Sequence, residues 1–543
     1  MGLSTLFVVA LAAAFNGVQA ANSTSEPELL KDITQISTYW GEMATYFDNP
    51  EDYFGVEYVG LPDGCQVESV QALQRHGDRF AITYIDDGVN NARFVEKVTN
   101  YTSAANTSAL FTGPLTFLNT YQSIMGETGL LTGLGASTEF KAGVSFWNKY
   151  GRTLFGASNS QLAYNATFMN GTARPKITLR TTSQPRIQNS QINWALGFFG
   201  PTFQAEANPT LANATSDFNV VIIAEGGTEN DTLASYDSCP QSGDSTIAYL
   251  GDFDVFQYIP KYLGPATARL NKYAPADFQL TTNDTYAMQD LCAYEQGYIG
   301  MSDFCNMFTA DEWAGFENTL DLAYYYDYAW GNPTGRAQGI GYLQELLARL
   351  NSTHITSSQS SVNSTLDDND TTFPLNQKIY VDFSHDDIIV SVLTALSMDY
   401  FREPPSQSQF PPDPERHFIL SHMTPFGARL FTETIGCSSP DPAPVKDSRV
   451  HYTPTQYGYD ASNASFKFIR MRLNDGILPL NTIRGGACGN ATSGRVDGMC
   501  SLENFLESQA ESDYMANYQY ACFGNYTVED PTSGYDYDGT IGL

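Results

Sequence analysis

Two arginines flank a histidine in the hexapeptide Gln-Arg-His-Gly-Asp-Arg, which contains Arg75, His76 and Arg79. A guanidinium group matches phosphate oxygens with two parallel hydrogen bonds and stays charged at any working pH. A neutral imidazole nitrogen can take a phosphoryl group covalently, and Gly77 lets the backbone come close to an anion. The alternative is a surface loop with two solvated arginines and an incidental histidine. These residues alone leave both interpretations open.

A second polar stretch contains His385, Asp386 and Asp387, which follow a short apolar run that starts near residue 378. A helix is expected over residues 388–398, so the three side chains would lie at its N-terminus. Exposed backbone N–H groups and the helix macrodipole favour anions there. Asp387 is interpreted as a helix N-terminal residue rather than a catalytic one. His385 and Asp386 are therefore the second set of candidate site residues.

A third loop, at residues 180–186, contains two arginines. It follows a β-like run at residues 176–179 and precedes a helical pattern over residues 187–199. Arg186 in this loop is a candidate phosphate ligand, whereas Arg180 is expected to hold the strand. Ligands bind at the carboxyl ends of strands in open α/β sheets, so the three loops can meet although they lie far apart in sequence. Two of the six histidines fall in these loops, and the other four are expected to be surface or packing residues: His354, His417, His422 and His451.

The elements that must position these loops are apolar runs of strand length that alternate with segments of helical period. The alternation predicts an α/β fold. Glu225 and two glycines end one of the runs, and Asn-Asp-Gly at residues 474–476 predicts a hairpin. Four strands of the sheet are expected around residues 67–73, 176–179, 218–223 and 378–383.

The same pattern divides the chain into an α/β core and two helical insertions that would form a cap. Residues 353–372 are rich in Ser, Thr, Asn and Asp and carry two glycosylation sequons, so an exposed glycosylated loop is expected there. The core is expected to comprise roughly residues 55–90, 175–260 and 373–543, and the insertions roughly residues 91–172 and 261–352.

The composition indicates a large globular chain that is strongly acidic. Its 543 residues are 42% hydrophobic, which suffices for a large core. The formal net charge at pH 7 is −32 with only 28 Lys and Arg residues, which argues against nucleic acid and anionic membrane surfaces as partners. Because the sequence pI is near 4.3, acid conditions would remove the repulsion between the protein and an anionic substrate.

The first residues and the sequons predict a secreted, extracellular protein. Residues 1–20 hold an apolar run that closes on Val-Gln-Ala, which is typical of a signal peptide, although no Lys or Arg precedes the run. No later segment approaches the roughly 18 apolar residues that span a bilayer, so no membrane contact is expected. Asn-x-Ser/Thr sequons, typical of a glycoprotein, occur at Asn22, Asn100, Asn106, Asn165, Asn170, Asn213, Asn230, Asn283, Asn351, Asn363, Asn369, Asn463, Asn490 and Asn525.

The cysteines agree with export. There are eight, without a Cys-x-x-Cys metal pattern, so four disulfides are expected in an oxidising compartment. Cys292 with Cys305, and Cys488 with Cys500, are close enough in sequence to form local bridges. The remaining four would pair over long range, namely Cys65, Cys239, Cys437 and Cys522.

The two polar stretches together resemble the paired signature of a known family. The stretches 75–79 (Arg-His-Gly-Asp-Arg) and 384–386 (Ser-His-Asp) are similar to the signature of the histidine acid phosphatases, and the similarity runs through essentially the whole mature chain. The closer resemblance is to the fungal phytase-type (phytase B-like) acid phosphatases of strongly acidic optimum. Three longer stretches carry it, at residues 54–65, 180–184 and 311–322.

This resemblance implies a role for each candidate residue. His76 would attack phosphorus and form a phosphohistidine, and Asp386 would protonate the leaving alcohol. No metal ion or other cofactor is implied. The phosphoryl oxygens would be held by Arg75, Arg79, Arg186 and His385.

The resemblance also implies the architecture. A phosphoglycerate-mutase-like three-layer α/β sandwich, with a helical cap made by insertions, would occupy residues 21–543. Similar fungal enzymes can be homo-oligomers. The implied disulfides are Cys65–Cys437, Cys239–Cys522, Cys292–Cys305 and Cys488–Cys500.

One feature departs from the family. A proline commonly follows soon after the second arginine, whereas Phe-Ala-Ile-Thr follows Arg79 here. The neighbouring pocket would then be reshaped, which affects substrate preference more than chemistry. Asp86, Asp87 and Glu295 are candidate acidic pocket residues that would accept phosphate only when protonated.

The expected function is the hydrolysis of phytate and other organic phosphate monoesters, with an optimum well below neutrality because Asp386 must be protonated to act as an acid. One alternative is a general acid phosphatase with little phytate activity. Another is an inactive phosphate-binding or wall glycoprotein. The His-Asp pair also occurs in metal-dependent phosphohydrolases, but no companion histidines lie at ligand spacing, so no metal site is expected.

Overall fold

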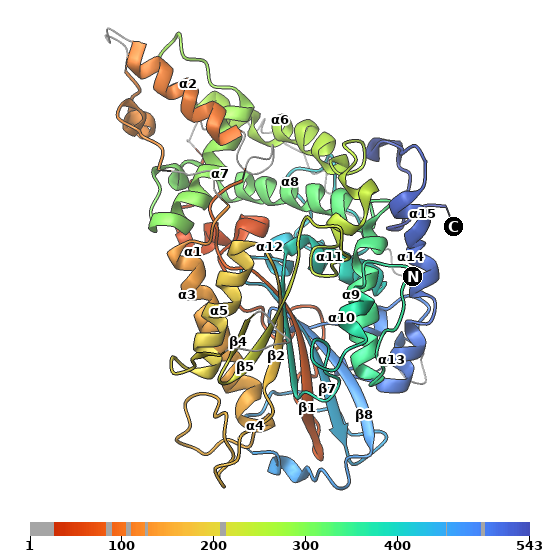
Figure 1. The fold of residues 1–543 in the computed structure, drawn as a ribbon. Helices are drawn as coiled ribbons and strands as arrows, with labels where there is room; N and C mark the ends of the chain where they lie inside the picture. The colour runs from red at the N-terminus through yellow and green to blue at the C-terminus, as the bar shows by residue number, and fades with distance from the viewer. Residues whose placement is uncertain are drawn as a thin grey trace, which may run out of the picture.

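The structure, a computed structural model, describes residues 27–82, 90–104, 110–124, 129–206, 213–451, 453–489 and 495–542. The expected signal peptide and the candidate pocket residues Asp86 and Asp87 lie outside these ranges. None of the described helices is long and apolar enough to cross a membrane. The described chain forms a sheet with helices on both faces and a further group of helices beyond one end of the sheet (Figure 1).

The centre of the molecule is a ten-stranded mixed sheet. All four strands expected from the sequence are neighbours in it and run parallel, so their carboxyl ends lie along one edge. These strands are, in spatial order, β1 (Cys65–Arg75), β6 (Ile379–Ser384), β2 (Ile177–Thr182) and β5 (Phe218–Ile223).

Antiparallel strands extend the sheet on both sides. Next to β1 lie β7 (Arg429–Cys437) and then β8 (Phe466–Leu473). The expected hairpin joins β8 to β9 (Gly476–Ile477), and Asn474 and Asp475 have the positive φ values of 48° and 75° that a tight hairpin turn needs. Short strands complete the sheet, with β4 (Asn213–Thr215) and then β3 (Ala205–Glu206) beyond β5, and β10 (Cys500–Ser501) beside β8.

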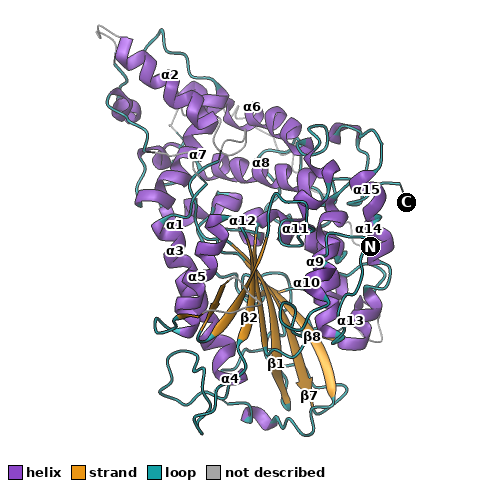
Figure 2. Ribbon diagram, viewed as in Figure 1, coloured by secondary structure: helices purple, strands orange, loops and turns teal. Residues whose placement is uncertain are grey.

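Helices cover both faces of the sheet, which confirms the three-layer α/β fold. On one face, α3 (Gly133–Phe146) and α5 (Pro185–Phe199) pack together. The ring of Trp194 in α5 lies 5.9 Å from that of Phe383 in β6. On the other face, α9 (Gly335–Leu350) packs against α11 (Asp386–Ala395). Figure 2 shows the strands converging beneath α11 and α12 (Leu420–Met423).

A group of helices forms a cap beyond the convergent end of the sheet (Figure 1). It consists of α2 (Asn90–Ala104), α6 (Leu250–Leu270), α7 (Thr282–Ile299) and α8 (Ala310–Tyr328). The expected insertions therefore differ from the cap, because α3 and α9 fall within them but belong to the layers beside the sheet. Helical period identifies a helix without showing which surface it packs against.

Residues 353–372 are only partly the exposed loop that the sequence predicts. The segment contains the short helix α10 (Ser364–Asp367), and Ser361, Val362 and Asp367 are buried. Oδ1 of Asp367 lies 3.5 Å from a guanidinium nitrogen of Arg180. The polar composition of this segment therefore does not reflect exposure alone, because Asp367 places its carboxyl group beside the buried guanidinium of Arg180.

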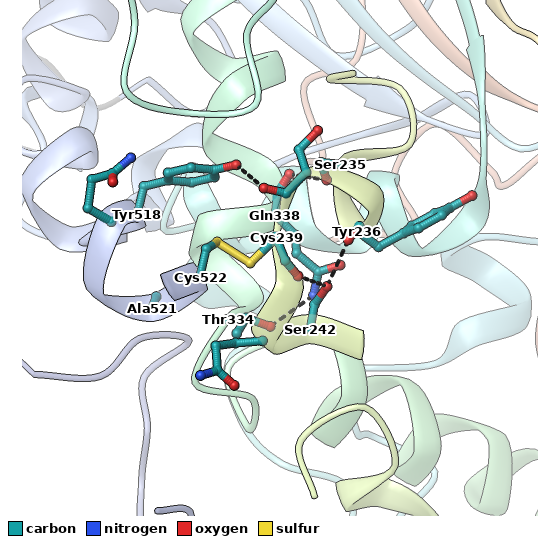
Figure 3. Close-up of a disulfide and its surroundings, with 12 residues drawn as sticks. Ser235, Tyr236, Cys239, Ser242, Thr334, Gln338, Tyr518, Ala521 and Cys522 are labelled. Atoms are coloured by element: carbon teal, nitrogen blue, oxygen red, sulfur yellow. Dashed lines mark hydrogen bonds between the residues drawn. A yellow bond between two sulfur atoms is a disulfide. The ribbon is translucent and has the colours of Figure 1, made fainter. Parts of the chain in front are cut away.

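Four disulfides are present, in the pairs that the resemblance implies. Cys65–Cys437 joins neighbouring residues of β1 and β7. Cys239–Cys522 joins α15 (Tyr518–Phe523) to the segment after the short 3-10 helix η6 (Ser235–Ser238) (Figure 3). The hydroxyl of Tyr518 donates to Ser238 O at 2.7 Å beside this bridge. The C-terminal part of the chain is thereby fixed to a segment that follows β5.

A buried ion cluster holds β2, β6 and α9 together. Nε of Arg180 donates to Asp382 Oδ1 at 2.8 Å, and Arg349 donates to Oδ2 of the same carboxylate at 2.6 Å. A second carboxylate, Glu345 of α9, accepts from Arg180 at 3.0 Å. Burial alone would raise the pKa of Asp382, but Arg180 and Arg349 outweigh it and lower this pKa to about 2. Arg180 therefore holds its strand, as the sequence predicts.

Replacement of Asp382 by asparagine is expected to lower the free energy of unfolding by about 3–5 kcal/mol, because Arg180 and Arg349 would lose a buried counter-charge. Urea denaturation followed by tryptophan fluorescence measures this loss. The control is Glu206→Gln, which removes a solvent-exposed ion pair with Lys176 and should change stability by less than about 1 kcal/mol. Equal effects of the two substitutions would contradict the interpretation.

Candidate active site

The carboxyl ends of the parallel strands place the candidate residues in one region. Arg75 is the last residue of β1, and His76 follows it. Ser384 ends β6, and His385 is the N-cap residue of α11. Arg186 lies in the first turn of α5, four residues after the last residue of β2. The three loops that are far apart in sequence are therefore brought together by adjacent strands.

His76 is held rigidly and almost completely buried. Its backbone N–H donates to Ser384 O at 3.1 Å, and its carbonyl accepts from Gly427 N at 2.8 Å. Nδ1 of the ring lies 2.8 Å from Gly77 O. Because a carbonyl oxygen only accepts hydrogen bonds, Nδ1 carries the proton, and Nε2 of the neutral ring keeps its lone pair.

The surroundings of His76 favour this neutral form. Burial lowers the pKa of His76 well below its ordinary value, and the positive charges of Arg186, Arg75 and Arg79 lower it further. The imidazole therefore stays unprotonated under acid conditions in which a solvated histidine would be charged. Nε2 therefore keeps its lone pair in acid.

Arg75 is fully buried and its guanidinium group is fixed on several sides. It donates to Thr424 O at 2.7 Å and to Glu42 O, and it forms an ion pair with Asp386. Its guanidinium carbon lies 4.4 Å from the centre of the Phe426 ring. Such contacts orient the charge before any ligand binds.

Arg79 and Arg186 bring two further positive charges to the same region. Arg79 donates to Phe80 O at 3.1 Å and approaches the hydroxyl of Tyr294 at 3.4 Å. Nε of Arg186 is buried and has no hydrogen-bond partner among the described residues. Burial and the charge of Arg79 lower the pKa of Arg186. Two guanidinium groups that repel each other form a suitable site for an anion.

Asp386 lies at the N-terminus of α11, beside these arginines. Its Oδ2 accepts from the hydroxyl of Tyr324 at 3.0 Å and pairs with Arg75, while Oδ1 accepts from the N–H of Asp387 at 3.0 Å. Burial would raise the pKa of Asp386, but Arg75, Arg79 and His385 outweigh it, so the pKa is lowered. The carboxylate is therefore ionised in the free site.

His385 completes the group of six residues that the structure brings together. Its ring centre lies 5.9 Å from that of His76, with the planes at 79°. Nε2 of His385 lies 3.1 Å from the hydroxyl of Tyr236 and 3.3 Å from Oε2 of Glu225. Glu225 was missed as a site residue, although its position just after β5 is the same signal that identified the other loops. Tyr236 and Tyr324 carry no such signal.

The remaining candidates have partners of their own. Glu295 of α7 accepts hydrogen bonds from Tyr121 and Ser302 at 2.7 and 2.6 Å, and its role as an acidic pocket residue stays a prediction. His417 and His422 stack on tyrosine rings, as expected of packing residues. Among the residues that the structure describes, no cluster of three or more His, Cys, Asp or Glu side chains could hold a metal ion.

Most of the chain matches one protein family. Residues 66–473 match the histidine phosphatase superfamily (branch 2), and the chain therefore belongs to this superfamily. The match contains both the Arg-His-Gly loop and the His385-Asp386 pair.

Individual relatives are named phytases. The chain is 30% identical to Phytase A of Aspergillus fumigatus over 458 residues, which cover 83% of this chain and 89% of the relative. It is 27% identical to Phytase A of Neurospora crassa over 536 residues, which cover 92% and 95%. The crystal structure of the phytase from D. castellii shares the fold, with a TM-score of 0.64 and 22% identity over 93% of this chain and 91% of that one.

Two glycines determine how closely α3 approaches the His76 loop. A Cβ atom on Gly77 would lie 2.5 Å from Gly135 O, and one on Gly135 would lie 2.2 Å from Asp78 O. Both contacts are with backbone, which cannot rotate away. The first turn of α3 therefore packs directly against the backbone that carries His76.

The substitution Gly77→Ala is expected to lower the free energy of unfolding by about 1–3 kcal/mol, because it overpacks this contact, and to reduce turnover by displacing His76. Chemical denaturation and steady-state kinetics measure the two effects. The control is Gly297→Ala in α7, where no atom lies within 4 Å of the added Cβ. This control should stabilise the protein slightly. Full activity in Gly77→Ala would show that the contact does not position His76.

Proposed function

We propose that this protein is a phosphomonoesterase in which His76 is the nucleophile. The observation that carries the proposal is a neutral imidazole, with Nε2 free to attack, surrounded by the guanidinium groups of Arg75, Arg79 and Arg186. Phosphoryl transfer requires an aligned nucleophile and stabilisation of negative charge more than elaborate covalent chemistry. This site supplies both.

The reaction would proceed in two displacements. Nε2 of His76 attacks phosphorus, the ester P–O bond breaks, and Asp386 gives its proton to the leaving alcohol oxygen. Water then attacks the phosphohistidine, Asp386 accepts a proton from that water, and the N–P bond breaks to release phosphate. Arg75, Arg79, Arg186 and His385 bind the phosphoryl oxygens throughout.

Asp386 must gain its proton when the substrate binds, because Arg75 keeps the carboxylate ionised in the free site. A bound phosphoryl group would bring negative charge next to Arg75 and Arg79 and thereby raise the pKa of Asp386. The acid preference then depends more on the substrate and on overall charge than on protonation of the free carboxylate. At acid pH the net charge of the protein, −32 at pH 7, becomes far less negative.

The substrate class we propose is phytate together with simpler phosphate monoesters. Support comes from the relatives named Phytase A and from the convergence of three arginines, which suits an ester that carries several phosphates. Secretion is supported by the four disulfides and by exposed sequons such as Asn165 and Asn170. A general acid phosphatase with little phytate activity is the alternative, and turnover of phytate relative to simple esters distinguishes the two.

Replacement of His76 by alanine should reduce kcat by about 10³-fold or more with every phosphate ester. The substitution Asp386→Asn should slow an ester with a poor leaving group, such as glycerol phosphate, about 10²–10⁴-fold. It should slow p-nitrophenyl phosphate less, because nitrophenol leaves with little help from an acid. Steady-state kinetics with the two esters provides the measurement. An unaffected rate in His76→Ala would remove the proposed mechanism.

The lowered pKa of His76 predicts where activity fails at low pH. Because protonation stops the nucleophile only below this pKa, the acid limb of kcat/KM should lie well below pH 6.5, the ordinary value for histidine. The substitution Arg186→Gln removes a positive charge beside His76, so the pKa should rise and the acid limb should move to higher pH. Lys272→Gln, which removes an exposed positive charge, is the control and should leave the limb in place. An unchanged limb in Arg186→Gln would contradict this cause.

A further inference from the structure

Glu225 is a buried carboxylate beside the site that the mechanism above does not use. It lies just after β5, and its backbone N–H donates to Ser183 Oγ at 2.9 Å. Its Oε1 accepts hydrogen bonds from Tyr236 at 2.6 Å and from the side-chain amide of Gln184. Its Oε2 lies 3.3 Å from Nε2 of His385. The carboxylate is therefore held on one side by the loop after β2 and faces the imidazole on the other.

Tyr236 determines which nitrogen of His385 carries a proton. Its hydroxyl has a single hydrogen, which is donated to Glu225, so its oxygen can only accept from the imidazole 3.1 Å away. Burial raises the pKa of Tyr236 well above its ordinary value, so the hydroxyl keeps this hydrogen. Nε2 of His385 thus faces two acceptors and must be a donor. Nδ1 is left as the nitrogen available to a ligand.

Several other charged groups face His385, and they differ in protonation. His76 lies in front of it, Asp386 is paired with Arg75, and Asp237 is exposed. Burial raises the pKa of Asp231 and of Asp387 to about 7, so both are neutral under acid conditions. Burial would also raise the pKa of Glu225, but His385 and Tyr236 lower it to about 2. Glu225 therefore stays ionised, and its Oε2 lies 3.3 Å from Nε2 of His385.

We propose that Glu225, with Tyr236, is a positioning residue that holds a proton on Nε2 of His385 and turns Nδ1 of that ring toward the phosphoryl group. The inference rests on the proposed function and deepens it. The rings of the two histidines lie 5.9 Å apart and are held through opposite nitrogens. Nδ1 of His76 faces the carbonyl of Gly77, whereas Nε2 of His385 faces the carboxylate of Glu225 and the hydroxyl oxygen of Tyr236.

Cys239–Cys522 fixes the segment that carries Tyr236. The hydroxyls of Ser242 and Ser235 donate to Tyr236 O at 3.2 Å and to Gln338 O at 2.6 Å. Figure 3 shows Tyr236 extending from this segment on the side away from the disulfide. The support of His385 therefore includes residues from α9 and from the C-terminal part of the chain.

The test is the substitution Glu225→Gln, which keeps the size of the side chain and removes its charge. We expect kcat/KM for p-nitrophenyl phosphate to fall about 10–100-fold and inhibition by inorganic phosphate to weaken. The matched control is Asp237→Asn, which removes a negative charge from the same region without a contact to His385 and should leave both quantities unchanged.

Two further variants keep the inference falsifiable if Glu225→Gln folds poorly. Glu225→Asp retains the charge and should restore much of the inhibition by inorganic phosphate even where kcat/KM stays reduced. Tyr236→Phe should weaken phosphate inhibition while the protein remains folded. A loss of kcat/KM in Glu225→Gln with unchanged inhibition by phosphate would overturn the inference in favour of a purely structural role. Failure of the parent protein to hydrolyse any phosphate ester would instead overturn the proposed function.

Discussion

The concentration of three guanidinium groups around His76 is the constraint on which the site depends. Arg75, Arg79 and Arg186 converge in a chain whose net charge is strongly negative, and their positive field lowers the pKa of His76. Burial and the charge of Arg79 lower the pKa of Arg186 as well. This concentration of positive charge would stabilise a phosphoryl group during transfer.

The fold maintains this arrangement by fixing backbone and side chains before any ligand arrives. Parallel strands set the positions of the loops. The backbone N–H of His76 donates to Ser384, and the backbone N–H of Gly427 donates to His76, so the loop is held in place. The buried cluster of Arg180, Asp382 and Arg349 holds β2 and β6 to α9. Repulsion between Arg79 and Arg186 at the carboxyl ends of the strands is thus opposed by buried ion pairs that hold β2 and β6 together.

Much of this arrangement could be predicted from the sequence, because the ends of parallel strands meet wherever such strands are adjacent. That rule identified Arg75, His76, Arg79, Arg186, His385 and Asp386 without coordinates. The same rule would also have identified Glu225, if the residues just after β5 had been treated as a fourth loop at the carboxyl end of a strand. Tyr236 and Tyr324 could not be found, because neither the short helix η6 nor the middle of α8 has a pattern that indicates which side chains reach the site. Helical period also could not show that α3 and α9 lie beside the sheet and not in the cap. The period indicates that a segment is helical, but it does not indicate what the helix packs against.

The bridge between Cys239 and Cys522 has a consequence for biosynthesis. Its cysteines are 283 residues apart, so this bridge can close only after Cys522 has left the ribosome. The parallel strands β1, β2, β5 and β6 are complete by residue 384, whereas the segment that carries Tyr236 is not fastened until α15 has been made. A nascent chain would therefore hold its arginines and His76 near each other while His385 still lacks its complete support, and shortening the chain before Cys522 would leave it permanently at that stage.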